Sequence, residues 1–113
     1  HVFGLIGSAT MEIFDALYDA DDIKFIGVHD ERTGTHMADG FARSSGHAGV
    51  ILAGQNGPGA TNLITGLAQA RAAYSPVVSI AGALASGHVY RDACGFGGLF
   101  DAQIACQNDC IGN

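Results

Sequence analysis

Two short segments of the chain carry residue types suited to binding and chemistry. The first is the loop Gly54–Asn62, with the sequence GQNGPGATN, which joins a predicted buried strand to a predicted helix. Gly57 and Gly59 allow backbone conformations and close approaches that a Cβ would prevent. The free N–H groups of the following helix point toward whatever binds there. The loop predicts a ligand-binding turn, although an ordinary strand-to-helix turn has the same composition.

The second segment is Asp30-Glu31, at the end of another predicted strand. Ligands of open α/β sheets bind outside the carboxyl ends of the strands, so Glu31 and the glycine loop are expected to face one crevice. A carboxylate enclosed in such a crevice is desolvated and can exchange a proton with a ligand. The alternative is that Glu31 interacts only with the dipole of the helix that it begins. Asp30 is expected to be a helix cap or a solvated neighbour.

Other combinations of reactive residues are incomplete. The glycine loop departs from the dinucleotide fingerprint G-x-G-x-x-G because Asn62 stands at the third glycine position, and the loop follows the third predicted strand. Four histidines show no metal-ligand spacing and are expected at or near the surface. They are His29, His36, His47 and His88. No metal site is therefore predicted in this chain.

These residues must be positioned by regular elements, and the apolar pattern predicts them. Four short apolar runs recur along the chain, each bounded by glycine, serine, aspartate or proline. They are Val2–Ile6, Lys24–Val28, Gly49–Ala53 and Val77–Ala81. Helix-like stretches separate them, which predicts βαβ units. The expected fold class is α/β, a parallel sheet with helices on both faces.

Three helices are predicted between the strands, over residues 9–20, 32–45 and 60–73. Ser8 is the expected N-cap of the first helix, and Gly46 is the expected C-terminal stop of the second. Gly34 and Gly40 lie inside the second helix, where glycine costs about 1 kcal/mol relative to alanine, so a close neighbouring backbone is expected there. The expected buried faces are Ala9, Ile13, Ala16, Leu17 and Ala20; Met37, Ala38, Phe41 and Ala42; and Leu63, Ile64, Leu67, Ala68 and Ala70.

Composition excludes several classes of protein. The 113 residues suffice for one domain, charged residues are only 14%, and the net charge is −6. The five basic residues are scattered, so no nucleic-acid surface is expected, and no apolar run reaches the roughly 18 residues of a membrane span. The low charge suggests that part of the surface meets a partner. The odd set of three cysteines, Cys94, Cys106 and Cys110, predicts reduced thiols and a cytoplasmic location.

Several ordered motifs together carry a family resemblance. They are Val2-Phe3-Gly4, Gly7-Ser8-Ala9, His29-Asp30-Glu31, His36–Arg43, Gly57–Asn62 and Ser75–Val78. In this order they resemble the N-terminal pyrimidine-binding domain of thiamine-diphosphate enzymes, in the acetolactate-synthase-like branch. The resemblance covers residues 1–93, which predicts a partial pyrimidine-binding domain there, an incomplete thiamine-diphosphate-binding fold. Residues 94–113 are predicted to be a divergent tail, since Cys94 follows where the family pattern has Phe-Gln-Glu.

Two segments bear on the subfamily. Ile6–Ala9 and Gly54–Gly59 look most like sulfoacetaldehyde acetyltransferase, because acetolactate synthases tend to have Pro-Gly-Gly and Ser-Gly-Pro-Gly there. The continuation Ala60-Thr61-Asn62 is instead similar to acetolactate synthases. Both subfamilies therefore stay open.

The resemblance implies a role for five residues. Glu31 matches the family's activating glutamate, which hydrogen-bonds the aminopyrimidine ring and favours the imino tautomer that removes the thiazolium C2 proton. Pro58 and Asn62 match positions that line the pyrimidine pocket. Gly57 and Gly59 would let the backbone approach the ring. Glu31 is thus the expected catalytic residue, and all five are expected to bind the cofactor.

The resemblance also implies a larger enzyme, a carboligase or acetyltransferase acting on 2-oxo acids or related carbonyls. The binding site for thiamine diphosphate and Mg²⁺ would be completed by the diphosphate-binding domain of another subunit in a homo-oligomer. Mg²⁺ would be bound outside this chain. The 113 residues alone are therefore expected to be inactive. One alternative is a separate small subunit of a thiamine-diphosphate decarboxylase. A less favoured alternative is a nucleotide-binding α/β domain.

Overall fold

The computed structural model describes residues 1–82 and 105–106. Its strands are β1 (Val2–Gly4), β2 (Phe25–Gly27), β3 (Gly49–Leu52), β4 (Val77–Ile80) and β5 (Ala105–Cys106). Its helices are the 3₁₀ turn η1 (Ser8–Thr10), α1 (Met11–Tyr18), α2 (Glu31–Ser45) and α3 (Pro58–Ala72). All four predicted strands and all three predicted helices are present, with ends that differ by a few residues. The predicted tail, apart from β5, lies outside the described residues, as do His88, Cys94 and Cys110.

The strands form one sheet in the order β2-β1-β3-β4-β5. The first four strands are parallel, and β5 pairs with β4 in the antiparallel direction. In the register of the sheet, Val2 of β1 lies between Phe25 of β2 and Val50 of β3. The predicted parallel α/β sheet is confirmed.

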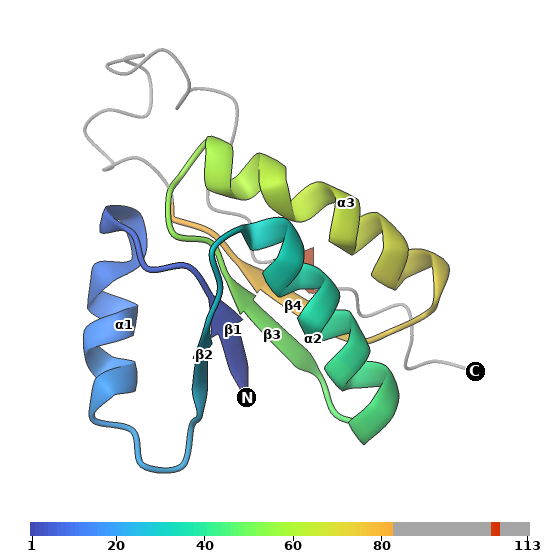
Figure 1. Cartoon of the computed structure of the whole chain (residues 1–113), viewed down its shortest axis with the longest axis horizontal. Helices are drawn as coiled ribbons and strands as arrows, with labels where there is room; N and C mark the ends of the chain where they lie inside the picture. Colours follow the sequence, from blue (N-terminus) through green and yellow to red (C-terminus); the bar gives the residue numbers. More distant parts are fainter. Residues whose placement is uncertain (83–104, 107–113) are drawn as a thin grey trace.

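Helices lie on both faces of the sheet, as Figure 1 shows. Phe3 of β1 contacts Phe41 of α2, with ring centroids 6.1 Å apart. Phe25 stands in the opposite orientation, because it is in register with Val2, and it meets Phe14 of α1 at 5.1 Å. Successive side chains of a strand point to opposite faces. It follows that α1 covers one face, while α2 and α3 lie side by side over the other.

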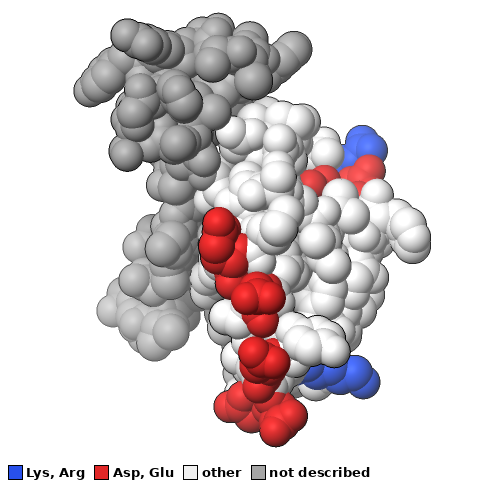
Figure 2. Space-filling view, turned by 90° about the vertical axis from the view of Figure 1, so that its left-hand side faces the viewer, with Lys and Arg blue, Asp and Glu red and all other residues white. Residues whose placement is uncertain are grey.

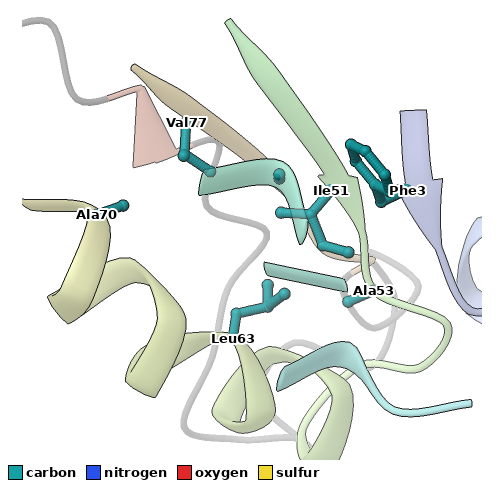
Figure 3. Packing of buried hydrophobic residues seen from close by; sticks show 7 residues of the cluster. Phe3, Ile51, Ala53, Leu63, Ala70 and Val77 are labelled. Carbon is teal, nitrogen blue, oxygen red and sulfur yellow. The ribbon is translucent and has the colours of Figure 1, made fainter. Parts of the chain in front are cut away.

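The hydrophobic core lies under α2 and α3 (Figure 3). Its members are one aromatic side chain and otherwise small or branched side chains from both layers, namely Phe3, Ala38, Ile51, Ala53, Leu63, Ala70 and Val77. Small residues let the two helices approach each other, since a Cβ on Gly66 of α3 would come within 2.5 Å of the Thr35 Cβ of α2. The resulting tight layer holds the starts of α2 and α3 side by side above the sheet.

The buried face of α2 differs from the predicted face. Met37 is 38% exposed, whereas Thr35 and Asp39 are buried. The Thr35 hydroxyl donates to the Glu31 carbonyl, and Oδ2 of Asp39 pairs with Arg43 at 2.6 Å. The buried Oδ1 of Asp39 has no hydrogen-bond partner among the described residues. A Cβ on Gly40 would have no neighbouring atom within 4 Å, so the close approach predicted there was wrong.

The first and third helices also bury less than predicted. Helix α1 has no fully buried residue, Ile13 is exposed, and Ile64 of α3 is 54% exposed. Ser8 is not an N-cap, because its hydroxyl donates to the Gln55 side chain instead. Gly46 does end α2, with a left-handed φ of 72°. The predicted helices are thus correct in place, but their rotation about their own axes was not predictable from apolar spacing.

Acidic side chains form a stripe along α1 and the turn that follows it (Figure 2). The exposed members are Glu12, Asp15, Asp19, Asp21 and Asp22.

Within residues 1–82, no helix is long and apolar enough to cross a membrane.

Tyr74 lies two residues beyond Ala72, the last residue of α3, and has the left-handed conformation with φ 54°. The Tyr74 N–H bonds the Arg71 carbonyl and the Ser75 N–H bonds the Ala70 carbonyl, the pattern of a Schellman motif, which favours glycine at this position. Because the side chain is 77% exposed, it gains little packing in return. We expect Tyr74→Gly to raise the free energy of unfolding by about 1 kcal/mol, measured by urea denaturation. Tyr74→Phe keeps the strain and should leave stability unchanged; an equal gain in both variants would contradict this account.

Candidate cofactor-binding site

The site lies at the carboxyl edge of the sheet, between β1 and β3. The chain leaves β1 toward β2 on one side and leaves β3 toward β4 on the other, so the two connections diverge there. Such a switch point is where open α/β sheets bind ligands. The loop 53–57 and the start of α2 both reach this edge.

Glu31 is the first residue of α2, and its carboxylate turns inward (3% exposed). Its Oε1 accepts a hydrogen bond from the Gly54 backbone N–H at 3.3 Å, and its Oε2 accepts one from Asn62 Nδ2 at 3.1 Å. A buried carboxylate needs such donors, because burial without them is costly. The structure therefore brings the predicted acid and the predicted glycine loop together, across a sequence separation of 23 residues.

Asp30 is a helix cap, which confirms one of the two roles expected for it. Its Oδ1 accepts from the Arg32 backbone N–H at 2.8 Å, which makes Asp30 the N-cap of α2. The side-chain hydrogen bond from Arg32 also holds the pKa of the Asp30 carboxyl below its usual value. Asp30 satisfies the helix terminus, so Glu31 remains directed toward the glycine loop.

The glycine loop turns sharply into α3. Gly57 has φ 54° and ψ −96°, a conformation that side chains disfavour, and Pro58 follows at the first position of the helix. Gly59 lies against the acid, because a Cβ there would stand 3.0 Å from Glu31 Oε1. Of the predicted site residues, Glu31, Gly59 and Asn62 are thus in one cluster. Gly57 and the exposed Pro58 form the turn beside them.

A second junction joins the loops that follow β1 and β3. A Cβ on Gly7 would overlap the backbone carbonyl of Gly54, so the two backbones are in close contact. Beside them, Ser8 Oγ donates to Gln55 Oε1 at 2.9 Å. Thr10 reinforces the junction from beneath, because its buried hydroxyl donates to the Ala53 carbonyl at 3.1 Å.

Sequence reasoning missed the roles of Gly54 as a donor to Glu31 and of Thr10 as a buried brace. The signal for Gly54 was present, since the glycine directly follows the predicted buried strand Gly49–Ala53, at the edge where ligands bind. Thr10 gave no signal, because a lone threonine near a helix start is usually a cap. His29, His36 and His47 are exposed, as expected.

The arrangement fits an aminopyrimidine ring. A carboxylate has about four acceptor positions, and Glu31 uses two of them for Gly54 and Asn62. The absence of a side chain on Gly59 leaves the Oε1 side of the acid without a Cβ beside it. Glu31 can therefore accept a further hydrogen bond from a protonated ring nitrogen. In the described part of the chain, no three His, Cys, Asp or Glu side chains are placed to hold a metal ion.

Fold and site together define an α/β domain with a mainly parallel sheet and a buried carboxylate at its switch point. The family described as "Thiamine pyrophosphate enzyme, N-terminal TPP binding domain" matches residues 1–104. The chain belongs to this family, whose cofactor, thiamine pyrophosphate, is the thiamine diphosphate expected from the motifs. The match extends beyond residue 93, and the domain boundary at that residue stays a prediction.

Curated relatives place the chain near two kinds of enzyme. It is 47% identical over 93 residues to an acetolactate synthase large subunit of Buchnera aphidicola subsp. Schizaphis graminum, covering 82% of this chain and 16% of that protein. A probable acetolactate synthase large subunit of Methanocaldococcus jannaschii is 46% identical over 92 residues, 81% of this chain and 15% of the relative. A sulfoacetaldehyde acetyltransferase of Castellaniella defragrans is 49% identical over 79 residues, 70% and 13% respectively. The chain thus spans about one sixth of the length of the acetolactate synthases that it matches.

Proposed function

We propose that this domain binds the aminopyrimidine half of thiamine diphosphate in a carboligase or acetyltransferase that acts on 2-oxo acids or related carbonyls. The observation that carries the proposal is the inward-facing carboxylate of Glu31, held by Gly54 and Asn62 at the switch point of the sheet. Family membership and the relatives named acetolactate synthase and sulfoacetaldehyde acetyltransferase support it.

In this proposal the residues of the chain orient the aminopyrimidine ring and supply a proton to it. Glu31 holds a proton between its carboxylate and the pyrimidine ring nitrogen. Asn62 and the Gly54 N–H fix the carboxylate in place, and Gly57, Pro58 and Gly59 shape the turn that faces the ring. Bound thiamine diphosphate supplies the electron sink for breaking or forming a bond next to a carbonyl.

In this proposal the other half of the cofactor site is supplied by a different domain. Mg²⁺ and the diphosphate would be held by the diphosphate-binding domain of another subunit in a homo-oligomer. The charged fraction of 14% supports burial of much of this surface against such a partner. The odd cysteine count supports a cytoplasmic, reducing location.

Assays of two proteins test the proposal. The full-length enzyme that carries these residues is expected to show turnover of a 2-oxo acid that requires both thiamine diphosphate and Mg²⁺. The purified 113-residue chain is expected to show none, because half of the cofactor site would be missing. Turnover by the 113 residues alone would contradict the shared site. If activity appears only after a separately encoded diphosphate-binding protein is added, the small-subunit alternative holds instead.

A further inference from the structure

The Ser8–Gln55 pair lies directly beside the Glu31 cluster and has no part in the proposed cofactor contacts. Ser8 follows β1 and Gln55 follows β3, so their 2.9 Å hydrogen bond spans the switch point where the two connections diverge. Gln55 is the residue after Gly54, whose N–H donates to Glu31. Both side chains of the pair are exposed, which leaves them accessible to a bound molecule.

The hydrogen bond decides which chemical group Gln55 presents. Because Ser8 donates to the amide oxygen Oε1, the amide nitrogen Nε2 is the end that remains, and it carries two N–H donors. Among the hydrogen bonds of residues 1–82, none has Nε2 of Gln55 as its donor. The carboxyl edge of the sheet thus offers two N–H donors to a ligand group that can only accept hydrogen bonds.

The donors that could bind an oxyanion at this position are neutral amide groups. The basic residue nearest in sequence to the acid, Arg32, is already paired with Asp30 at 2.6 Å. Neutral amide donors are therefore what this edge offers a carboxylate or a sulfonate, and hydrogen bonds to charged groups are stronger than those to neutral ones. The amino end of α3 starts at Pro58, three residues after Gln55, and contributes a favourable dipole.

We propose that the Ser8–Gln55 pair determines substrate specificity by donating the Gln55 amide N–H groups to the oxyanion of a carbonyl substrate. The substrate class is a small carbonyl compound that bears a carboxylate or a sulfonate close to the reacting carbon. Ser8 acts as the positioning residue that fixes which end of the amide faces the substrate. This inference rests on the proposed function of the same site.

The test is Gln55→Glu in the full-length enzyme, which replaces the donors by an anionic acceptor of the same size. We expect the KM of anionic substrates, assayed with a 2-oxo acid and with a sulfonated aldehyde, to rise about tenfold or more, as expected for loss of a hydrogen bond to a charged group. The KM of a neutral aldehyde and the Kd of thiamine diphosphate should change less than about twofold. The substrate whose KM rises identifies the natural oxyanion.

Two further variants serve as a control and as a substitute for this test. Gln69→Glu makes the same chemical change on the exposed surface of α3 and should leave every KM unchanged. Should Gln55→Glu fail to fold, Gln55→Met removes the donors without adding charge and should raise the same KM values. Equal effects on anionic and neutral substrates, or no effect on either, would overturn the inference. Absence of any cofactor-dependent turnover in the unmodified enzyme would instead reject the proposed function.

Discussion

Replacing Glu31 by glutamine is expected to lower the turnover of the full-length enzyme by about 10²–10⁴-fold, the contribution typical of a positioned general acid or base. The amide cannot hold a proton for the pyrimidine ring. It also cannot accept from both Gly54 and Asn62, because one end of an amide is a donor. The measurement is kcat at saturating thiamine diphosphate and Mg²⁺.

Glu12→Gln is the matched control for this prediction. Glu12 is the only other glutamate of the chain and lies exposed on α1, so the same change there should leave kcat unaltered. A thermal melt of each variant separates loss of chemistry from loss of folding. If Glu31→Gln turns over at the rate of the unmodified enzyme while folding normally, Glu31 does not act on the cofactor.

Replacing Gly7 by alanine is expected to disrupt the site without touching any charged group. The added Cβ would overlap the Gly54 carbonyl, and the neighbour is backbone that cannot rotate away. The loops after β1 and β3 must therefore move apart, which shifts the Gly54 N–H away from Glu31. We expect a loss of about 1–3 kcal/mol in the free energy of unfolding, typical of overpacking, together with weaker thiamine diphosphate binding. Chemical denaturation and calorimetric titration measure the two effects.

Gly40→Ala provides the opposite result from the same substitution. Gly40 lies inside α2 with no atom within 4 Å of a Cβ, so alanine should stabilise the helix by up to about 1 kcal/mol. Cofactor affinity should be unchanged in this variant. A stable Gly7→Ala protein with normal affinity would show that the contact between the two loops does not support the site.

The sequence allowed prediction of the sheet, because each parallel strand is a short apolar run bounded by turn residues. The rotation of each helix about its own axis was harder to predict from the sequence. Asp39 and Thr35 are polar, and apolar spacing assigns such residues to the surface. Thr35 donates to the Glu31 carbonyl, and one oxygen of Asp39 pairs with Arg43, and such partners appear only in three dimensions.

The candidate site was likewise predictable in part from the sequence. Glu31 and the glycine loop could be predicted because both end strands of a parallel sheet, whose carboxyl ends share an edge. The Gly54 N–H, the Gly7 contact and the Ser8–Gln55 hydrogen bond depend on strand order, since β1 and β3 are neighbours although β2 lies between them in the chain. Strand order does not follow from local pattern, so these contacts required the structure.

The central claim is that Glu31 activates thiamine diphosphate through the pyrimidine ring. The most direct measurement is the rate at which the C2 proton of thiamine diphosphate exchanges with deuterium in the full-length enzyme, in the unmodified, Glu31→Gln and Glu12→Gln forms. The account predicts exchange slowed by about 10²-fold or more in Glu31→Gln and unchanged in Glu12→Gln. Equal exchange rates in all three proteins would contradict it and would leave Glu31 as an acid that only stabilises the start of its helix.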